Sequence, residues 1–169
     1  MSIFRRTTRL PDDVRRGLDL PAGDRVLAAA ELLDDAWAVA TFRAVHVTTE
    51  PPLSRPWTAV DRAAFDPITS EITVEWVDDD PPLVLALADA DRTAFPQMLR
   101  ERVQASVVIA ETLAFTAERQ ARVSVRRDHD GTLFSQVSVD PGVDLHDPRV
   151  SRRIDEAEAN VRSASGLPL

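Results

Sequence analysis

The stretch from Trp37 to Val47 constrains the fold of this chain more than any other segment. On both sides of Phe42-Arg43, larger residues such as Trp37, Val39, Val45 and Val47 alternate with alanine or with a polar residue. Alternation with a period of two is typical of a β-strand with two distinct faces. The connection at Phe42-Arg43 is too short for anything but a reversal, so the two strands are expected to pair antiparallel. The sequence therefore predicts a β-hairpin at the centre of a small sheet.

Further strands are expected on both sides of this hairpin, at residues 25–33, 57–65, 71–77 and 83–89. The first of them has an Ala-Ala-Ala-Glu-Leu-Leu centre that is also compatible with a helix. The last is apolar on both faces, which is typical of a central or covered strand. The proline-rich segment 50–56 is expected to be a loop, because prolines remove hydrogen-bond donors and fix φ.

The second half of the chain begins with a change of period. Apolar spacing predicts a helix over about 93–105, capped by Asp91 or Thr93. Strands are expected over about 106–140, although residues 106–115 are also compatible with a continued helix. The strands include a hairpin that turns at Asp128-His129-Asp130-Gly131. A last helix is expected over about 147–165, where Asp147 would cap it and Pro148 suits its first turn.

The composition excludes several classes of function. The chain has 169 residues, no cysteine and no lysine, which excludes disulfides, zinc–thiolate sites, P-loops and Schiff-base catalysis. A net charge of −8 disfavours nucleic-acid and anionic-membrane partners. There is no apolar run of the roughly 20 residues that a membrane helix needs, and no signal-peptide pattern. A cytoplasmic protein is expected.

Three short segments stand out in the first half of the chain: Gly23-Asp-Arg-Val-Leu27, the hairpin from Trp37 to Val47, and Trp57-Thr-Ala-Val60. They resemble the bacterial pleckstrin-homology-like (PH-like) domain as found in high-GC bacteria. The resemblance implies an α+β fold: a PH-like antiparallel β half-barrel with a capping helix, followed here by an extra β-hairpin and a C-terminal helix. It implies a binding role and no catalytic residues. We expect residues 1–22 to form an N-terminal segment with a short helix at 10–18, and residues 23–169 a single domain.

One acidic cluster is a candidate metal site. Its members lie between the last strand and the last helix: Asp140, Asp144, His146 and Asp147. Hard cations prefer clustered carboxylates, so these residues would make a metal- or small-ligand-dependent enzyme the alternative function. The competing interpretation is that they are ordinary turn and cap residues. The same holds for Asp78-Asp79-Asp80, which precedes two prolines and is expected to be a solvated turn.

Several arginines are candidates for a binding surface: Arg100, Arg102, Arg126 and Arg127. Clustered on one face, they would bind nucleic acid, which is a second alternative function. The competing interpretation is a solvated surface of arginines paired with Asp and Glu. Lipid headgroup binding is disfavoured, because Asp34 and Asp35 occupy the first loop of the PH-like pattern, where basic residues would be needed.

His46 and the three tryptophans have structural and functional interpretations. A general base at His46 is conceivable, but no serine or carboxylate can be placed beside it from the sequence. Trp37, Trp57 and Trp76 each fall at a core-facing position of an expected strand, so core packing is preferred to a ligand box.

The sequence thus predicts a non-enzymatic protein–protein interaction or self-association module without a cofactor. Its partner would be a protein or a second copy of the chain, bound at the last helix or at an exposed sheet edge. The sequence assigns no pathway and no oligomeric state.

Overall fold

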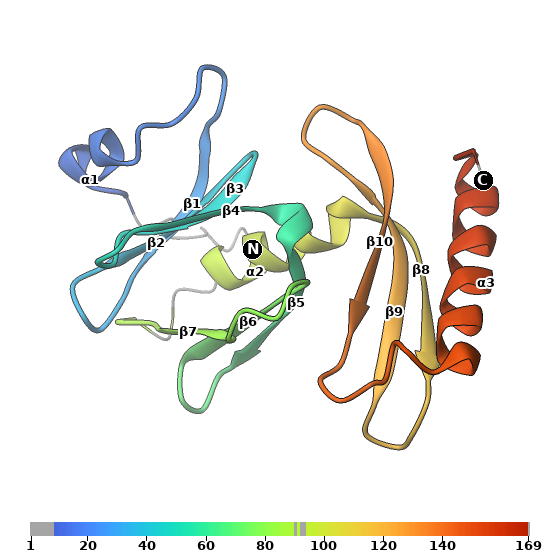
Figure 1. The fold of residues 1–169 in the computed structure, drawn as a ribbon. Helices are drawn as coiled ribbons and strands as arrows, with labels where there is room; N and C mark the ends of the chain where they lie inside the picture. Colours follow the sequence, from blue (N-terminus) through green and yellow to red (C-terminus); the bar gives the residue numbers. More distant parts are fainter. Residues whose placement is uncertain (1–8, 90, 92–93, 169) are drawn as a thin grey trace, which may run out of the picture. The chain divides into compact units, whose positions relative to one another are not determined.

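The computed structural model describes residues 9–89, 91 and 94–168 (Figure 1). Thr93, one of the two expected helix caps, lies outside the described residues. Within the described part the protein is α+β, as predicted, and it contains three helices and three small antiparallel sheets. None of the described helices is long and apolar enough to cross a membrane. The chain divides into two compact units, Met1–Trp76 with Pro81–Val103 and Val77–Asp80 with Gln104–Leu169.

The first unit contains two sheets, two α-helices and a short 3-10 turn. The first sheet has the order β1-β2-β3-β4, with β1 at Val26–Glu31, β2 at Trp37–Thr41, β3 at Ala44–Val47 and β4 at Leu53–Pro56. The second has the order β5-β6-β7, with β5 at Val60–Asp66, β6 at Glu71–Trp76 and β7 at Leu83–Ala86. Helix α1 is Asp12–Gly17, the 3-10 turn η1 is Trp57–Ala59, and helix α2 is Ala94–Ser106. The predicted hairpin is confirmed: β2 and β3 pair antiparallel around a two-residue loop, and residues 25–33 form a strand rather than a helix.

Two predictions between Glu50 and Phe65 are wrong. The segment expected to be a loop contributes β4, which pairs with β3. As β4 is the outer strand of its sheet, its proline costs no ladder hydrogen bond on the open side. The strand expected from Trp57 begins only at Val60, because residues 57–59 form η1. The Trp57 side chain is buried there, and its indole Nε1 donates a hydrogen bond to the carbonyl of Thr41 at 3.1 Å.

One hydrophobic core joins both sheets of the first unit to α2. It includes Val45 and Val74 from the sheets and Phe95 and Leu99 from the helix. The two sheets meet at a single antiparallel bridge between Leu32 and Leu87. They are open sheets rather than a closed barrel, and β7 is an outer strand of its sheet rather than a central one.

The tryptophans divide between two clusters. Trp57 and Trp76 are buried in the main core, as predicted. Trp37 is not part of that core, which corrects its expected position. It packs partly buried against Leu10 and Val39, on the side where α1 lies. Successive side chains of a strand point to opposite faces, so Trp37 and Val39 lie opposite Ala38 and Ala40, which enter the main core.

The second unit is a three-stranded sheet with a helix on one face (Figure 1). Its order is β10-β9-β8, with β8 at Val107–Ala114, β9 at Gln120–Arg127 and β10 at Leu133–Val139, and helix α3 is Pro148–Ser165. The preferred strand at 106–115 is therefore confirmed over the helical alternative. Strand residues such as Val123 and Val125 pack against Ile154, Ala157 and Val161 of α3.

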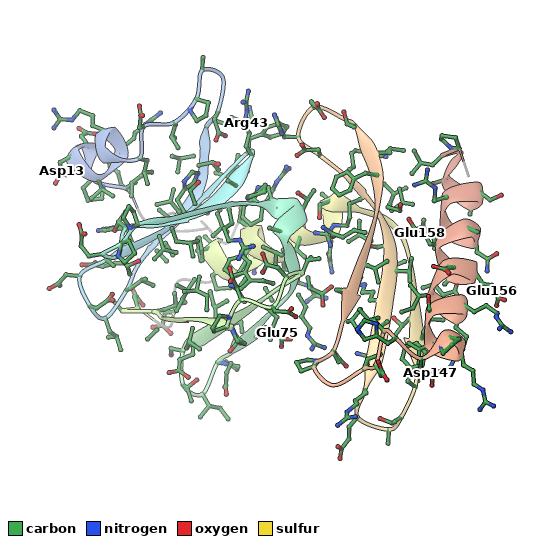
Figure 2. All side chains as sticks on the ribbon, in the orientation of Figure 1. Asp13, Arg43, Glu75, Asp147, Glu156 and Glu158 are labelled. Atoms are coloured by element: carbon green, nitrogen blue, oxygen red, sulfur yellow. The ribbon has the colours of Figure 1, made fainter. Side chains whose placement is uncertain are left out.

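The termini and faces of α3 follow from its sequence. Asp147 caps the helix, and its carboxylate accepts a hydrogen bond from the Arg149 backbone N–H. Gly166 ends it with a left-handed φ of 77°, which glycine adopts without strain. Figure 2 shows Glu158 on the sheet side and Glu156 pointing away from the sheet, and the Ser135 hydroxyl of β10 donates a hydrogen bond to Glu158. The outer face of α3 is thus charged and solvated.

Candidate functional site

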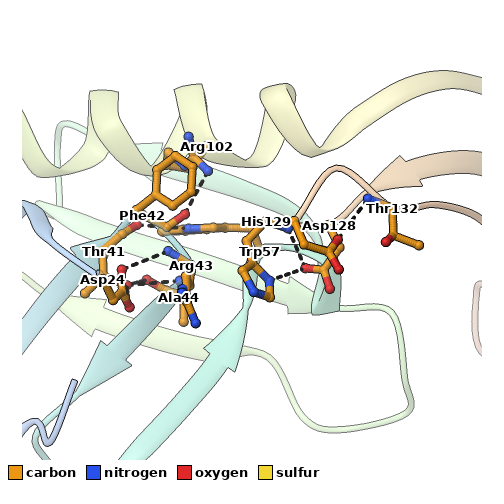
Figure 3. Close-up of polar contacts among 11 residues, drawn as sticks. Asp24, Thr41, Phe42, Arg43, Ala44, Trp57, Arg102, Asp128, His129 and Thr132 are labelled. Atoms are coloured by element: carbon orange, nitrogen blue, oxygen red, sulfur yellow. Dashed lines mark hydrogen bonds and ion pairs between the residues drawn. The ribbon is translucent and has the colours of Figure 1, made fainter. Parts of the chain in front are cut away.

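A polar network surrounds the loop of the β2–β3 hairpin (Figure 3). The carboxylate of Asp24 accepts hydrogen bonds from the Thr41 hydroxyl at 2.9 Å and from the backbone N–H groups of Arg25 at 2.9 Å and Arg43 at 3.3 Å. Thr41 Oγ1 in turn accepts a hydrogen bond from the Ala44 N–H at 3.1 Å. Side chains therefore close this loop, which contains neither glycine nor a residue with positive φ.

Three arginines gather around this loop. The guanidinium carbon of Arg102 lies 4.8 Å from the centroid of the Phe42 ring, and that of Arg25 lies 5.8 Å from it. Arg102 Nη2 also donates a hydrogen bond to the Phe42 carbonyl at 2.8 Å, and Arg43 Nη2 donates to the Ala22 carbonyl at 3.3 Å. We call Arg25, Phe42, Arg43 and Arg102 the Phe42 cluster. Within it, two cations share the surface of one aromatic ring.

The positive charges of the Phe42 cluster repel one another. Burial lowers the pKa of Arg102, the nearby charge of Arg25 lowers it further, and Asp24 partly offsets both effects. A like charge disfavours the charged form of a neighbour, so Arg25 and Arg102 are close enough to repel each other. The cluster is therefore electropositive, with Asp24 as the nearby carboxylate.

His46 belongs to the same network but is buried. Its residue is 7% exposed, and its Nε2 lies 3.3 Å from the Thr41 hydroxyl oxygen. Burial lowers the pKa of His46, and the charge of Asp24 opposes that shift. The structure thus places a hydroxyl and a carboxylate near His46 that the sequence did not suggest. Because the ring is enclosed, it acts as a hydrogen-bond partner within the hairpin rather than as a base that reaches a substrate.

The candidate metal ligands each have a local hydrogen-bonding role. Asp140 accepts a hydrogen bond from the Gln120 N–H at 3.0 Å, and Asp144 accepts one from the His146 N–H at 2.9 Å. Asp147, labelled in Figure 2, accepts one from the Arg149 N–H at 2.8 Å as the cap of α3. Across residues 9–89, 91 and 94–168, no group of three or more His, Asp or Glu is arranged to hold a metal ion.

The candidate arginines are divided between the two units. Arg100 and Arg102 lie on α2, where Arg100 is exposed and Arg102 packs on Phe42. Arg126 and Arg127 end strand β9, where Arg126 is buried and Arg127 is exposed on the opposite face. Neither unit by itself carries the expected patch of four arginines. Of the arginines in the Phe42 cluster, Arg102 was a candidate from the sequence, whereas Arg25 and Arg43 belong to distant segments and were indicated by no local pattern.

The Asp128-His129-Asp130-Gly131 segment is the predicted hairpin turn. Gly131 has a φ of 91° and donates a backbone hydrogen bond to the Asp128 carbonyl at 3.0 Å. Asp128 Oδ1 lies 3.0 Å from His129 Nδ1, as Figure 3 shows. Hydrogen bonds from the backbone and side chain of Thr132 lower the pKa of Asp130. The polar groups of this segment stabilise the turn itself.

The outer strand β8 of the second unit is a different kind of candidate site, an edge to which another strand could pair. Strand β8 pairs with β9 on one side, and its residues alternate between partly buried and exposed. Its exposed positions include Val108 and Thr112, with Val108 39% exposed. The strand contains one charged residue, Glu111, and neither proline nor glycine. This composition is typical of a strand that is paired on both sides.

Comparison with known proteins places the chain in no family: no family model, curated protein or solved structure matches it.

Proposed function

We propose that this protein is a non-enzymatic module for protein–protein interaction, and that it self-associates through the outer edge of β8. The observation that carries this proposal is the position of an eight-residue, largely apolar strand at the edge of a three-stranded sheet. An edge strand presents backbone N–H and C=O groups to which a strand of another chain can add. The partner would be β8 of a second copy.

The other features of β8 define where pairing would occur. Natural edge strands are blocked by prolines, lysines, inward charges or bulges. In β8 the register shifts between Val107 and Ile109, and Glu111 is the one charge. The regular stretch of residues 109–113 is therefore the surface that would pair, because the Ala114 carbonyl already accepts a hydrogen bond from Arg153 Nη1 at 3.3 Å. Strand β4 is a poorer edge, because it has four residues and ends in Pro56.

The PH-like interpretation of the first unit is part of this proposal. Seven antiparallel strands in two sheets precede α2, which shares their core. This order supports a PH-like half-barrel with a capping helix, in which the sheets serve as a scaffold for binding rather than for catalysis.

Light scattering on a size-exclusion column tests self-association. We expect the wild-type protein to form a dimer that dissociates on dilution. In the double variant Val108→Lys, Thr112→Lys, two exposed side chains of β8 become charged, so the dimer is expected to be lost. The matched control is Ala159→Lys, Ser163→Lys, which adds the same charge to exposed positions of α3 and should stay dimeric.

A wild-type protein that is monomeric at every concentration would contradict self-association. Equal loss of the dimer in both double variants would show that charge alone, rather than the edge of β8, is responsible. Metal analysis of the same peak tests the alternative function. Stoichiometric metal that disappears in Asp144→Ala, His146→Ala would favour a metal-dependent enzyme at the Asp140–Asp147 segment.

A further inference from the structure

The Phe42 cluster carries an inference that is independent of strand β8. Its three arginines come from separate parts of the first unit: Arg25 precedes β1, Arg43 lies in the hairpin loop, and Arg102 lies on α2. Figure 3 shows the Arg102 side chain beside the Phe42 ring. The guanidinium groups of Arg25 and Arg102 both lie over the ring, and Arg102 is also held by its hydrogen bond to the Phe42 carbonyl.

The nearby carboxylate of Asp24 offsets these charges only in part. It accepts hydrogen bonds from the Thr41 hydroxyl and from two backbone N–H groups. Among the described residues, no carboxylate forms an ion pair with the guanidinium of Arg25, Arg43 or Arg102. Two like charges on one ring repel each other, so the arrangement is most stable with an anion between or beside them.

Arg102 also has an unused donor. Its Nη2 bonds to the Phe42 carbonyl, but its buried Nε has no hydrogen-bond partner within the described part of the chain. A buried donor without a partner is destabilising, because its lost hydration is not compensated. The Arg102 residue is otherwise only partly buried, so a ligand oxygen can accept from the rest of its guanidinium.

We propose that the Phe42 cluster binds a phosphate group through Arg25 and Arg102. The planar donor fork of arginine matches phosphate oxygens, and such charge-assisted bonds are stronger than neutral ones. A phosphate monoester carries about −1.5 to −2 charge at neutral pH, so one group balances both guanidinium groups. A carboxylate, with a single charge, would balance only one of them. The proposal covers a free phosphate and a phosphate monoester, which present the same oxygens.

Arginine side-chain spectra of 15N-labelled protein provide the test. Inorganic phosphate, and in a second titration phosphoserine, is added at constant ionic strength while the Nε–H cross-peaks are followed. We expect the peaks of Arg25 and Arg102 to shift in a saturable way and that of Arg100 to stay in place. A response to both ligands indicates a site for a phosphate monoester, and a response to inorganic phosphate alone indicates a site for the free anion.

Three variants define the site. Arg25→Gln and Arg102→Gln should each weaken phosphate binding by about tenfold or more, because each removes charge-assisted hydrogen bonds. Arg100→Gln is the matched control: the side chain is exposed on the same helix as Arg102, and the change in charge is the same. It should bind phosphate like the wild type. Arg25 is exposed and makes no described side-chain hydrogen bond, so Arg25→Gln tests the site even if Arg102→Gln unfolds.

Three results would overturn the proposal. The first is the absence of any phosphate-dependent shift in the wild-type protein. The second is equal affinity in Arg25→Gln and Arg100→Gln, which would mean that the site lies elsewhere. The third is an equally strong shift of the same peaks with acetate, which would show that the cluster does not select phosphate.

Discussion

The carboxylate of Asp24 accepts a hydrogen bond from the hydroxyl of Thr41 at 2.9 Å, across 17 positions of the chain. Asp24 precedes β1, whereas Thr41 ends β2 and accepts a hydrogen bond from Ala44 of β3. This one pair therefore ties the entry of the first sheet to the loop of its central hairpin. The same two residues neighbour His46 and the Phe42 cluster.

We expect Asp24→Ala to lower the free energy of unfolding by about 2 kcal/mol, because hydrogen bonds to a charged acceptor contribute about 1.5–3 kcal/mol. Chemical denaturation measures the change. Asp13→Ala is the control, since Asp13 is exposed on α1 and a change there should stay within about 0.5 kcal/mol. Additive effects of Asp24→Ala and Thr41→Val in a double-mutant cycle would show that the two side chains are not coupled.

His46 should make stability depend on pH. Its pKa in the folded protein is lowered from 6.5 by burial, so the unfolded chain takes up a proton near that pH while the folded protein does not. The free energy of unfolding is therefore expected to fall as the pH is lowered through 6.5 toward the folded pKa. Denaturation at a series of pH values should show a shallower slope in His46→Gln. The slope of the control, His146→Gln at an exposed loop position, should match the wild type.

Asp147→Ala should destabilise α3 by about 1 kcal/mol, because it removes the side chain that caps the helix. Helix content and denaturant midpoint are the measurements. Asp144→Ala removes a carboxylate of the same loop that bonds to His146 outside the helix, so its effect should be smaller. If added metal instead stabilised the wild type and neither variant, the two aspartates would be metal ligands.

Ile154→Ala should lower the free energy of unfolding by about 3 kcal/mol, since it leaves a cavity where α3 packs on its sheet. Arg152→Ala, on the exposed face of the same helix, should have little effect. Both are compared by denaturant unfolding with far-UV circular dichroism. A small effect of Ile154→Ala would mean that α3 contributes little to the core of the second unit.

The local patterns anticipated many of the helices and strands, but the candidate sites less well. Asp140, Asp144 and Asp147 were candidate ligands because carboxylates serve metals and turns alike. In the structure each carboxylate accepts a hydrogen bond from a backbone N–H group, which is the role of a turn or cap residue. The spacing of the residues in the sequence does not specify these partners. The Phe42 cluster was missed because its members are far apart in the sequence. Arg102 reaches the Phe42 carbonyl across 60 positions, and no motif relates segments so far apart.

The sequence by itself determined the elements whose signals are local. The period of two around Phe42 predicted the β2–β3 hairpin, and the aspartate cap, proline and apolar stripe predicted α3. The tertiary structure decided the elements whose stability depends on distant partners. Segment 107–114 is a strand because β9 supplies its hydrogen bonds, and β4 forms despite its proline because it pairs with β3 on one side only. Hydrogen bonds between strands, unlike those of a helix, join residues that the sequence does not place together.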